Sequence, residues 1–331
     1  MYAVVLVGGF GTRLRPLTID VPKPMLPVVH RPMIVRLVER LADAGVTDVV
    51  LALGFRPQPF EAAFPDGVHA GVRIHYAVEP EPLDTAGAIA FAARSMEIDS
   101  TFIVANGDVI TDLNFADLVA AHHAAGTDAT IHLTPVEDPS SFGVVEVDQS
   151  GVIGRFLEKP SPGDTDSNLI NAGTYVFEPA VLDLIEPDVP VSVERTTFPL
   201  LVARGRLCGF ATDDYWIDTG RPELFLQANL DLINGARGSV EDGVASGALV
   251  DLEAIVIESV VAAGVVVEAT ASVNQSVLLP GAHIESGALI ERSIVAGRIG
   301  SGATVRGSVI GAGFVVPDDA VVAAERLPAP E

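Results

Sequence analysis

Apolar and polar positions in the first third of the chain form an alternating series of strand and helix patterns. Apolar runs of strand length occupy residues 3–7, 49–53, 74–78 and 101–105, and apolar residues at helical spacing occupy residues 33–41 and 86–93. Strands that alternate with helices predict an α/β domain with a doubly wound, mostly parallel, Rossmann-like sheet. Ligands of such sheets bind outside the carboxyl ends of the strands, where Gly8-Gly9 and Asn106-Gly107-Asp108 fall.

The pattern changes in the middle of the chain. Residues 142–148 and 153–157 alternate as strands on either side of the turn signal Gln149-Ser150-Gly151, which predicts a hairpin inserted in the α/β domain. Residues 222–232 have the spacing of an amphipathic helix, and Asn234-Gly235 ends it. We therefore expect one domain over residues 1–235 and a second over residues 236–331.

The C-terminal segment has a short period. Val, Ile and Leu recur at six-residue intervals between small residues, as at Ile284 and Ile290, at Ile299 and Val305, and at Val267, Val273 and Leu279. One apolar residue per flat face predicts a parallel β-helix, which we expect to be left-handed. The register slips between Ile290 and Ile299, which indicates an imperfect coil. A sandwich of short strands is the alternative.

Composition narrows the class of protein. The chain has 331 residues, of which 49% are hydrophobic, and this excludes intrinsic disorder. The single cysteine, Cys208, excludes a disulfide scaffold and favours a reducing compartment. No apolar run reaches the roughly 20 residues needed to span a bilayer, and no basic segment precedes the first apolar run. We expect a cytoplasmic protein without membrane contact.

Charge limits the partners. The formal net charge of −24 argues against a nucleic-acid partner, because that partner requires a basic face. An anionic ligand must then be held by a few cations, by backbone N–H groups or by a metal. The chain has 18 arginines and only two lysines, Lys23 and Lys159, and both precede proline. Codon bias explains the scarcity of lysine but not these two positions, so we expect both lysines to be functional.

The glycine-rich segment after the first strand is the strongest local motif. Three glycines within four residues, Gly8, Gly9 and Gly11, allow close approach of a ligand and direct N–H groups at phosphates. The segment is neither a Walker A loop nor a Rossmann fingerprint. Arg13 and Lys23 follow it and supply the cations that a phosphate ligand requires.

This loop opens a series of motifs that resembles the sugar-1-phosphate nucleotidylyltransferases. GGFGTRLRPLT and PKPMLPV are followed, in the family's order, by Asn106-Gly107-Asp108, Phe142-Gly143-Val144, Glu158-Lys159-Pro160, Asn171-Ala172-Gly173, Ser192-Val193-Glu194-Arg195 and Trp216-Ile217-Asp218-Thr219-Gly220. The resemblance covers about residues 2–230. The mannose-1-phosphate guanylyltransferases are the most similar branch, through Thr85-Ala86-Gly87, the segment 192–195 and the C-terminal repeats.

The resemblance implies an enzyme that converts an NTP and a sugar 1-phosphate to an NDP-sugar and pyrophosphate with Mg²⁺. GTP and mannose 1-phosphate are the favoured substrates, and a glucose-1-phosphate thymidylyl- or uridylyltransferase is the alternative. Such a reaction needs positioning and charge stabilisation rather than a protein nucleophile. A non-catalytic subunit that binds an NDP-sugar is less favoured, because such a subunit is expected to have lost cations or metal ligands that are present here.

The resemblance also assigns roles to residues. It implies a nucleotide site of Leu6, Gly8, Gly9, Gly11, Thr12, Arg13, Lys23, Thr85, Gly87 and Asp108. It implies a sugar-phosphate site of Gly143, Glu158, Lys159, Asn171, Gly173 and Arg195. Arg13 and Lys23 are the expected catalytic cations, and Asp108 and Asp218 the expected Mg²⁺ ligands, since carboxylates suit this ion.

A few positions depart from this pattern or lie outside it. Asp84 replaces a glycine of the family in Leu83-Asp84-Thr85, where it either caps the following helix, fills space or contacts a base. His122 and His123 are expected on the surface of a helix. His283, the only histidine of the repeats, is not expected to act as an acyltransferase base. The apolar repeat faces predict a homo-oligomer.

Overall fold

The computed structural model describes residues 1–54 and 57–329. The chain divides into two compact units, which are described separately. The first contains Met1–Gly9 and Ile34–Trp216, and the second contains Phe10–Met33 and Ile217–Glu331. Among the described helices, none is both long enough and apolar enough to cross a membrane.

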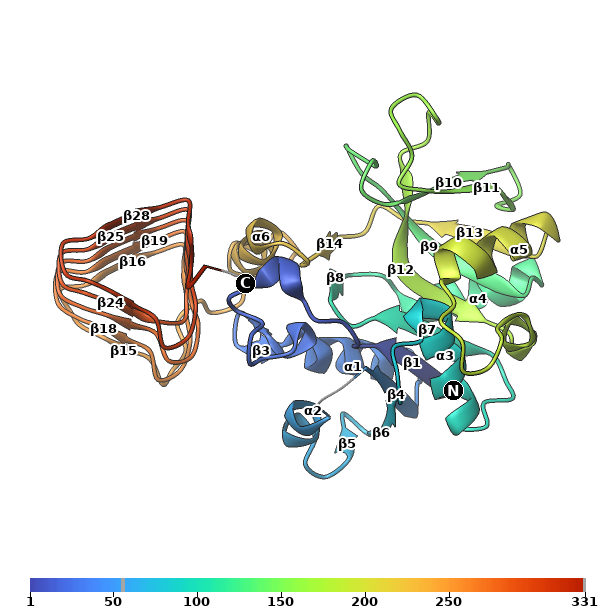
Figure 1. The fold of residues 1–331 in the computed structure, drawn as a ribbon, viewed down its shortest axis with the longest axis horizontal. Helices are drawn as coiled ribbons and strands as arrows, with labels where there is room; N and C mark the ends of the chain where they lie inside the picture. The colour runs from blue at the N-terminus through green and yellow to red at the C-terminus, as the bar shows by residue number, and fades with distance from the viewer. Residues whose placement is uncertain (55–56, 330–331) are drawn as a thin grey trace. The chain divides into compact units, whose positions relative to one another are not determined.

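The first unit is built on a ten-stranded mixed sheet (Figure 1). Along its main path the strands are β11 (Ile153–Glu158), β10 (Gly143–Val147), β12 (Leu169–Phe177), β7 (Phe102–Asn106), β1 (Tyr2–Leu6), β4 (Asp48–Leu53), β6 (Val72–Val78) and β5 (Val68–His69). The strands β1, β4, β6 and β7 are parallel, whereas β12 is antiparallel to β7. Strand β9 (Ala129–Pro135) pairs with β12 and with β13 (Leu207–Ala211). The predicted α/β fold class is confirmed.

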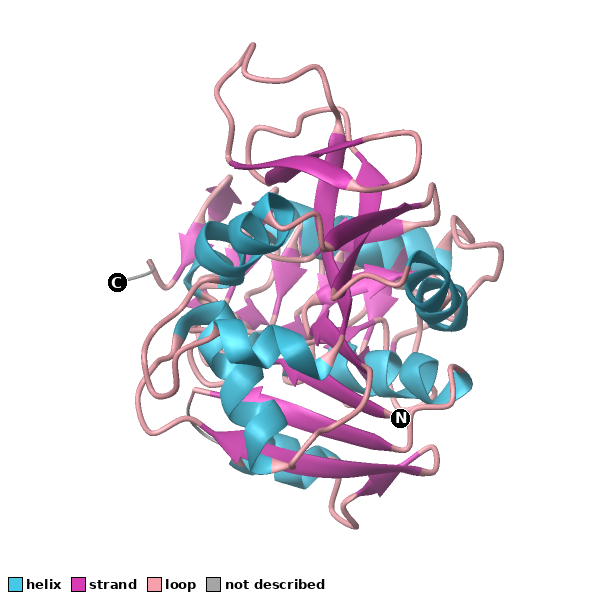
Figure 2. Cartoon of the chain, turned by 90° about the vertical axis from the view of Figure 1, so that its right-hand side faces the viewer, coloured by secondary structure: helices cyan, strands magenta, loops and turns pink. Residues whose placement is uncertain are grey.

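Helices pack against this sheet (Figure 2). The helices of the unit are α1 (Met33–Asp43), α2 (Gln58–Ala63), α3 (Asp84–Ser95), α4 (Phe115–Ala125) and α5 (Phe198–Ala203), with short helical turns at Pro179–Leu184 and Val193–Thr197. The alanine-rich helix α3 packs on β1, β4 and β6, and its small side chains permit a close approach. Large aromatic side chains, among them Tyr175, Phe177 and Phe198, fill the core beside β12.

The predicted hairpin is present. Strands β10 and β11 are antiparallel, and Gly143 pairs with Glu158 at their open end. The turn is ordered by Asp148, whose carboxylate accepts hydrogen bonds from the N–H groups of Ser150 and Val152. The hydrogen bond that the Ser150 hydroxyl donates to Asp148 Oδ1, together with those from the backbone N–H groups, holds the pKa of Asp148 below its usual range.

The second unit contains the predicted left-handed parallel β-helix (Figure 1, orange to red). Its three parallel stacks of five strands form the faces. The first face consists of β15 (Leu249–Val250), β18 (Val266–Val267), β21 (His283–Ile284), β24 (Arg298–Ile299) and β27 (Val315–Val316). The second consists of β16 (Ile255–Ile257), β19 (Ser272–Asn274), β22 (Leu289–Glu291), β25 (Thr304–Arg306) and β28 (Val321–Ala323). The third consists of β17 (Val260–Val261), β20 (Val277–Leu278), β23 (Ile294–Val295), β26 (Val309–Ile310) and β29 (Arg326–Leu327).

The coil length explains the slip in the six-residue period. Equivalent serines on successive coils are 17 residues apart, except for one step of 15 residues between Ser293 and Ser308. The shorter coil has only two residues between β23 and β24, which end and begin at Val295 and Arg298. The third face also differs from the six-residue expectation, because the core cluster contains Leu278 rather than Leu279.

A ladder of buried serines runs along one corner of the β-helix. The N–H groups of Ser276, Ser293 and Ser308 each donate to the hydroxyl of the serine one coil earlier, and Glu325 N–H donates to Ser308 Oγ at 3.1 Å. Ser259 begins the series, and all four serines are at most 4% exposed. The ladder therefore satisfies backbone N–H groups that water cannot reach.

The rest of the second unit surrounds helix α6 (Pro222–Ile233). Asn229 of α6 is fully buried, and its Oδ1 accepts a hydrogen bond from Val29 N–H at 2.6 Å. The segment Phe10–Met33 contains two helical turns, Thr12–Leu14 and Lys23–Met25, and the strands β2 (Pro27–Val28) and β3 (Arg31–Pro32). This N-terminal segment thus forms part of the same compact unit as the β-helix.

Candidate active site

The carboxyl end of β1 holds the first part of the glycine-rich loop. Leu6, the last residue of β1, pairs with Asn106 of β7, and its carbonyl accepts a hydrogen bond from Gly107 N–H at 2.9 Å. Gly8 and Gly9 follow and are exposed. The structure therefore brings the two segments that were predicted to lie at the ligand edge of the sheet next to each other.

Asp108 lies between β7 and β8 (Val109–Thr111). Its position directly after Gly107 places it at the carboxyl edge of the sheet, beside the end of β1. Its side chain is partly buried. This is a position from which a carboxylate can reach a bound ligand or ion.

Glu79 is a candidate residue that the sequence analysis missed. It follows β6, is only 8% exposed, and its Oε2 accepts a hydrogen bond from Leu83 N–H at 2.8 Å. Its Oε1 lies 4.0 Å from the point that a Cβ on Gly8 would occupy. Burial raises the pKa of Glu79, although the hydrogen bond from Leu83 acts in the opposite direction. A buried acid beside the glycine-rich loop is a strong candidate for ligand recognition.

The start of α3 is tied to the segment after Ser192. Thr85 Oγ1 donates to Glu194 Oε2 at 2.9 Å and accepts from Val193 N–H at 2.8 Å. Gly87 N–H donates to Val191 O at 3.1 Å. The groups predicted for nucleotide binding at Thr85 and Gly87 thus hold the loop before α3 in place.

Asp84 and Arg195 form an ion pair on the surface. Arg195 Nη2 lies 3.2 Å from Asp84 Oδ2, and Asp84 Oδ1 accepts a hydrogen bond from Thr85 N–H at 2.7 Å. Asp84 has a φ of +58°, in the left-handed region that favours glycine. This conformation explains why a glycine suits the position. Both carboxylate oxygens of Asp84 are thus engaged, Oδ1 by the neighbouring Thr85 N–H and Oδ2 by the distant Arg195.

The open end of the β10–β11 hairpin carries Glu158 and Lys159. Lys159 Nζ lies 3.6 Å from Glu158 Oε1, and the lysine side chain is 66% exposed. Lys159 N–H donates to Phe142 O, and the Phe142 ring meets that of Trp216 edge-on at 5.8 Å. With Gly143 paired to Glu158, the end of the hairpin presents one exposed cation and one carboxylate to a ligand.

Asn171 and Gly173 lie where the pairing of β12 is irregular. Asn171 Nδ2 donates to Tyr175 Oη at 3.1 Å, and Asn171 Oδ1 accepts from Gly173 N–H at 3.0 Å. Gly173 has a φ of +76°, and a Cβ there would lie 2.5 Å from Asn106 Nδ2. Only glycine permits this approach. Gly173 is therefore packed against the residue that precedes Gly107 and Asp108.

The second unit contains Arg13 and the remainder of the loop. Thr12 and Arg13 belong to the helical turn that begins after Gly11, whose carbonyl accepts a hydrogen bond from Thr18 Oγ1 at 2.8 Å. The Arg13 guanidinium lies beside Gly220, because a Cβ on Gly220 would come within 2.7 Å of Arg13 Nη2. Arg13 is exposed, so its guanidinium can contact an anion.

Lys23 and Asp218 form an ion pair in the same unit. Lys23 Nζ lies 3.3 Å from Asp218 Oδ1, which also accepts a hydrogen bond from Gly220 N–H at 2.8 Å. Lys23 is only 7% exposed. The two lysines thus differ sharply, since Lys23 is buried against a carboxylate whereas Lys159 is exposed. Arg13, Lys23, Asp218 and Gly220 form one cluster, which we call the cation cluster.

The residues present fit a divalent cation of the Mg²⁺ type. Among the described residues, no group of three or more His, Cys, Asp and Glu side chains could hold a metal ion. Mg²⁺ needs only one or two carboxylates, because phosphate oxygens and water complete its coordination. Lys23 Nζ and Gly220 N–H both contact Oδ1 of Asp218, so Oδ2 remains without a hydrogen bond from the residues that the structure describes.

The histidines have structural surroundings. His122 is buried, contrary to the surface expectation, because its ring nitrogens contact Thr130 Oγ1 and Glu178 Oε1. Burial lowers the pKa of His122. His283 Nε2 lies 2.7 Å from Glu268 Oε1. Cys208 is buried in β13 as a free thiol.

Comparison with known protein families assigns each part of the chain. The family described as "Nucleotidyl transferase" matches residues 2–235. The family described as "GlmU-like, C-terminal hexapeptide" matches residues 233–300 and 250–327. The first match covers more than half of the chain.

Similar proteins carry related names. The chain is 46% identical over 231 residues to a mannose-1-phosphate guanyltransferase of Gibberella zeae. The matched residues make up 68% of this chain and 62% of that protein. It is 43% identical to the mannose-1-phosphate guanylyltransferase of Mycobacterium tuberculosis over 77% of this chain and 73% of that protein. Among solved structures, HddC from Yersinia pseudotuberculosis complexed with GMP-PN is 29% identical, with a TM-score of 0.58 over 69% of this chain and 97% of that chain.

Proposed function

Since the chain belongs to the nucleotidyl transferase family, we propose that it converts GTP and mannose 1-phosphate to GDP-mannose and pyrophosphate. The observation that carries the substrate proposal is the similarity to proteins named mannose-1-phosphate guanylyltransferase, at 41–47% identity. The chain covers 62% of the length of the Gibberella zeae relative. The presence of Arg13, Lys23, Asp108 and Asp218 supports an enzyme over a subunit that only binds.

The cation cluster is the proposed site of phosphate chemistry. Arg13 contacts the triphosphate and the departing pyrophosphate, and the buried ammonium of Lys23 stabilises charge that grows in the transition state. Asp108 and Asp218 are the proposed Mg²⁺ ligands, and the ion, when bound, neutralises phosphate oxygens. Gly8, Gly9, Gly11 and Thr12 supply backbone N–H groups to the nucleotide.

The hairpin and β12 form the proposed sugar-phosphate site. Lys159 pairs with the phosphate of the sugar, and its exposure leaves the ammonium free to turn from Glu158 to the ligand. Glu158 accepts hydrogen bonds from sugar hydroxyls. Asn171 can both accept hydrogen bonds from these hydroxyls and donate hydrogen bonds to them. Gly143 and Gly173 permit the close packing of Phe156 and of Asn106 beside this site, and Arg195 adds a phosphate contact. The sugar phosphate is itself the nucleophile, so no strong base is required.

Lys159 and Lys23 provide a test of these roles. Lys159→Ala is expected to raise KM for the sugar 1-phosphate much more than KM for the NTP, whereas Lys23→Ala is expected to lower kcat with either substrate saturating. Lys159→Arg is not expected to restore full activity, because a planar fork replaces a compact ammonium. If Lys159→Ala changed only KM for the NTP, the assignment of the two lysines would have to be reversed.

Glu79 is the proposed reader of the base. Glu79 Oε2 accepts from Leu83 N–H, which leaves Oε1 to accept from an N–H donor of guanine, whereas both oxygens of Asp84 are engaged. Losing one base contact in a dry pocket costs about 1–3 kcal/mol. Glu79→Gln should therefore lower kcat/KM for GTP by about 10- to 100-fold, whereas the control Glu81→Gln, at an exposed position of the same segment, should not.

The experiment that tests the proposal measures pyrophosphate release with GTP, dTTP, UTP, ATP and CTP, each against mannose 1-phosphate and glucose 1-phosphate. We expect the highest kcat/KM for GTP with mannose 1-phosphate. A preference for dTTP or UTP with glucose 1-phosphate would replace the guanylyltransferase assignment by the thymidylyl- or uridylyltransferase alternative. Absence of turnover with every pair would favour the binding subunit.

We also propose a homo-oligomer and a cytoplasmic location. Apolar side chains are exposed on the first coil of the β-helix, at Leu249, Leu252, Ile255 and Ile257, where β15 and β16 have an unpaired edge. Such an edge favours pairing with another copy. The single, reduced cysteine supports a reducing compartment. Light scattering of the full chain and of a Leu252→Asp, Ile255→Asp variant tests the oligomer.

A further inference from the structure

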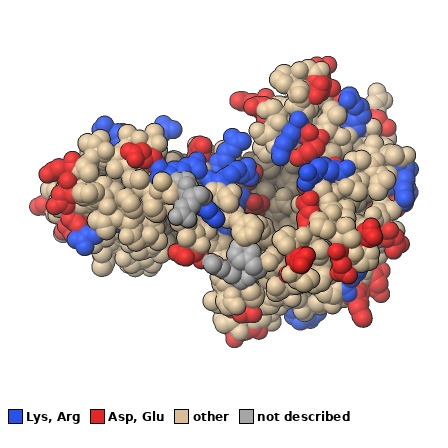
Figure 3. All heavy atoms as spheres, in the orientation of Figure 1, with Lys and Arg blue, Asp and Glu red and all other residues tan. Residues whose placement is uncertain are grey.

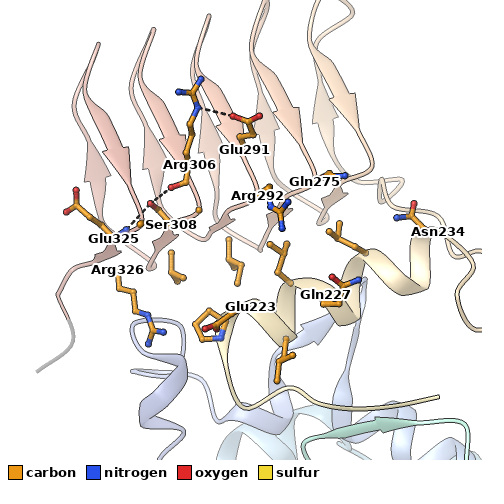
Figure 4. Close-up of a pocket in the computed structure, with 18 residues that line it drawn as sticks. Glu223, Gln227, Asn234, Gln275, Glu291, Arg292, Arg306, Ser308, Glu325 and Arg326 are labelled. Atoms are coloured by element: carbon orange, nitrogen blue, oxygen red, sulfur yellow. Dashed lines mark hydrogen bonds and ion pairs between the residues drawn. The ribbon is translucent and has the colours of Figure 1, made fainter. Parts of the chain in front are cut away.

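The second unit contains a groove of about 920 Å³ between α6 and the serine-ladder corner of the β-helix (Figure 4). One wall is α6, which contributes Gln227 and Leu230. The other wall is the corner that carries Gln275 and Arg292. The volume falls in the range of small-molecule sites.

The groove concentrates positive charge in an acidic protein. Residues 236–331 contain five arginines, and three of them, Arg292, Arg306 and Arg326, line this groove. Basic side chains gather over α6 and the adjoining edge of the β-helix (Figure 3). Three glutamates, Glu223, Glu291 and Glu325, also line the groove, so its affinity for an anion depends on which of these carboxylates face the arginines.

Two of the three carboxylates in the lining are directed away from Arg292 and Arg326. Glu291 is paired with Arg306, whose Nε lies 2.9 Å from Glu291 Oε2. The carboxylate of Glu325 points away from α6 (Figure 4). Two guanidinium groups of the lining then remain, those of Arg292 and Arg326. Among the described lining residues, Glu223 at the start of α6 is the one remaining acidic side chain.

These two guanidinium groups have donors to spare. Arg292 is exposed, and its backbone N–H donates to Asn274 O, whereas its guanidinium makes no hydrogen bond or ion pair with any residue that the structure describes. Arg326 uses Nη1 to donate to Arg13 O at 2.8 Å. Each guanidinium has five N–H donors. A phosphate can accept two of them from one arginine, in the geometry that makes arginine the preferred phosphate ligand.

The spacing of the two arginines suits a ligand with more than one phosphoryl group. Val309 pairs with both Ile294 and Arg326 in the third face, so Arg326 and the strand after Arg292 are two strands apart. Two strand spacings amount to about 10 Å. Long side chains that reach inward from this separation can hold the two ends of a diphosphate.

We propose that this groove binds a nucleoside diphosphate or another phosphate ester with two phosphoryl groups, held by Arg292 and Arg326. Gln227 and Gln275 offer amide groups to the hydroxyls of the ester, and Leu230 and Ile294 supply apolar contacts. The ligand site is separate from the cation cluster, in which none of these residues takes part. It does not depend on which sugar or base the enzyme uses.

Arg326 connects the groove to the cation cluster. The carbonyl that accepts its hydrogen bond belongs to Arg13, whose guanidinium lies beside Gly220. A ligand that draws Arg326 into the groove competes with that hydrogen bond. Binding in the groove is therefore expected to change the affinity of the enzyme for its NTP, by about five-fold or more if the coupling is of ordinary size.

The first test measures binding without turnover. The full chain is treated with phenylglyoxal, and labelling of each arginine is followed by peptide mass spectrometry, alone and with inorganic phosphate, pyrophosphate, GDP or mannose 1-phosphate. Arg298, which lies in β24 on the first face and is paired with Glu285, serves as the internal control. We expect pyrophosphate or GDP to slow labelling of Arg292 at least five-fold and to leave Arg298 unchanged. Equal labelling of Arg292 under all conditions would overturn the proposal.

The second test uses matched variants. Arg292→Ala should remove the part of the protecting compound's effect on KM for the NTP that exceeds direct competition at the cation cluster, while basal turnover is unchanged, and Arg298→Ala should retain the whole effect. An Arg292→Ala enzyme that still responds like the wild type would refute the site. Because the labelling experiment does not require catalysis, a failure of the proposed guanylyltransferase activity would not affect its result.

Discussion

The sheet of the first unit and the β-helix of the second bury apolar side chains in different ways. The core beside the sheet contains large aromatic residues such as Tyr175, Phe177 and Phe198, each in a position that has no equivalent elsewhere in the unit. The β-helix uses Val, Ile, Leu and Ala at equivalent positions of every coil, and its core contains no fully buried aromatic residue among those described. One region is specified by individual contacts and the other by repetition.

This difference has consequences for function. In the first unit, the candidate sugar site depends on a single close approach, that of Gly173 to Asn106. In the β-helix, the same hydrogen bond is made four times along the serine ladder. We therefore expect a substitution in the sheet to affect both stability and activity, and a substitution in the ladder to affect stability alone.

The largest expected effect on activity comes from removing the carboxylate of Asp108, in the first unit, or that of Asp218, in the second. Asp108→Asn and Asp218→Asn should each lower kcat by about 100-fold or more, because a neutral amide is a poorer ligand for Mg²⁺ than a carboxylate. Turnover is measured as pyrophosphate release over a range of Mg²⁺ concentrations. Asp213→Asn, at an exposed position near Asp218 in sequence, is the control. Normal Mg²⁺-dependent rates in either variant would reject that residue as a metal ligand.

Gly173→Ala tests the dependence of the sheet on single positions. The new Cβ would meet Asn106 Nδ2 and would also occupy a left-handed conformation, so we expect a loss of about 3 kcal/mol in the free energy of unfolding. Gly205→Ala is the matched control, since Gly205 has a φ of +63° but open space around it. It should cost about 1 kcal/mol. Equal losses in urea denaturation would show that Asn106 moves aside without cost.

Ser293→Ala tests the repeated ladder. The substitution leaves the buried Ser308 N–H without an acceptor, which costs about 1–3 kcal/mol. Ser286→Ala, which removes an exposed hydroxyl bound to Glu268, should change the free energy of unfolding by less than about 0.5 kcal/mol. Turnover at low temperature should be unchanged in both variants. A large loss of activity in Ser293→Ala would contradict the separation of the two regions.

Asp84→Gly has the smallest expected effect. It relieves a left-handed conformation and removes one exposed ion pair, which is worth little. The free energy of unfolding is therefore expected to rise by about 0.5–1 kcal/mol, while the ranking of NTP substrates stays the same. A lower stability would indicate that the Asp84 carboxylate stabilises the start of α3 more than the conformation costs. A changed ranking would indicate contact with the base.

Local patterns predicted much of this architecture. The run before Gly8 predicted β1, the turn at Gln149-Ser150-Gly151 predicted the hairpin, and the recurring Val and Ile predicted the β-helix. These predictions succeed because each depends on neighbours in sequence. The order of strands in the sheet could not be predicted in this way, since β12 lies between β7 and β10, and such pairings join segments distant in sequence.

The candidate site shows the same limit. The motif residues were found from the sequence, whereas Glu79 was missed, because an acid in Glu79-Pro80-Glu81 gives no sign of its burial. A signal was present, since Glu79 directly follows a predicted strand. The burial of Lys23 against Asp218 also could not be predicted, because 195 residues separate them. Residue type indicates possible chemistry, whereas burial depends on distant packing.

The joining of Phe10–Met33 to the second unit has a consequence for how the chain is made. Arg13 leaves the ribosome early, but the Arg326 side chain that binds its carbonyl is 313 residues away. At 5–20 residues per second, roughly 15 seconds to a minute pass between the synthesis of the two. Asn229, which holds Val29, is 200 residues later than its partner. The Arg13 carbonyl therefore gains Arg326 as its partner only after the last described coil has been synthesised, whereas the residues of the cation cluster, which end at Gly220, are all synthesised earlier.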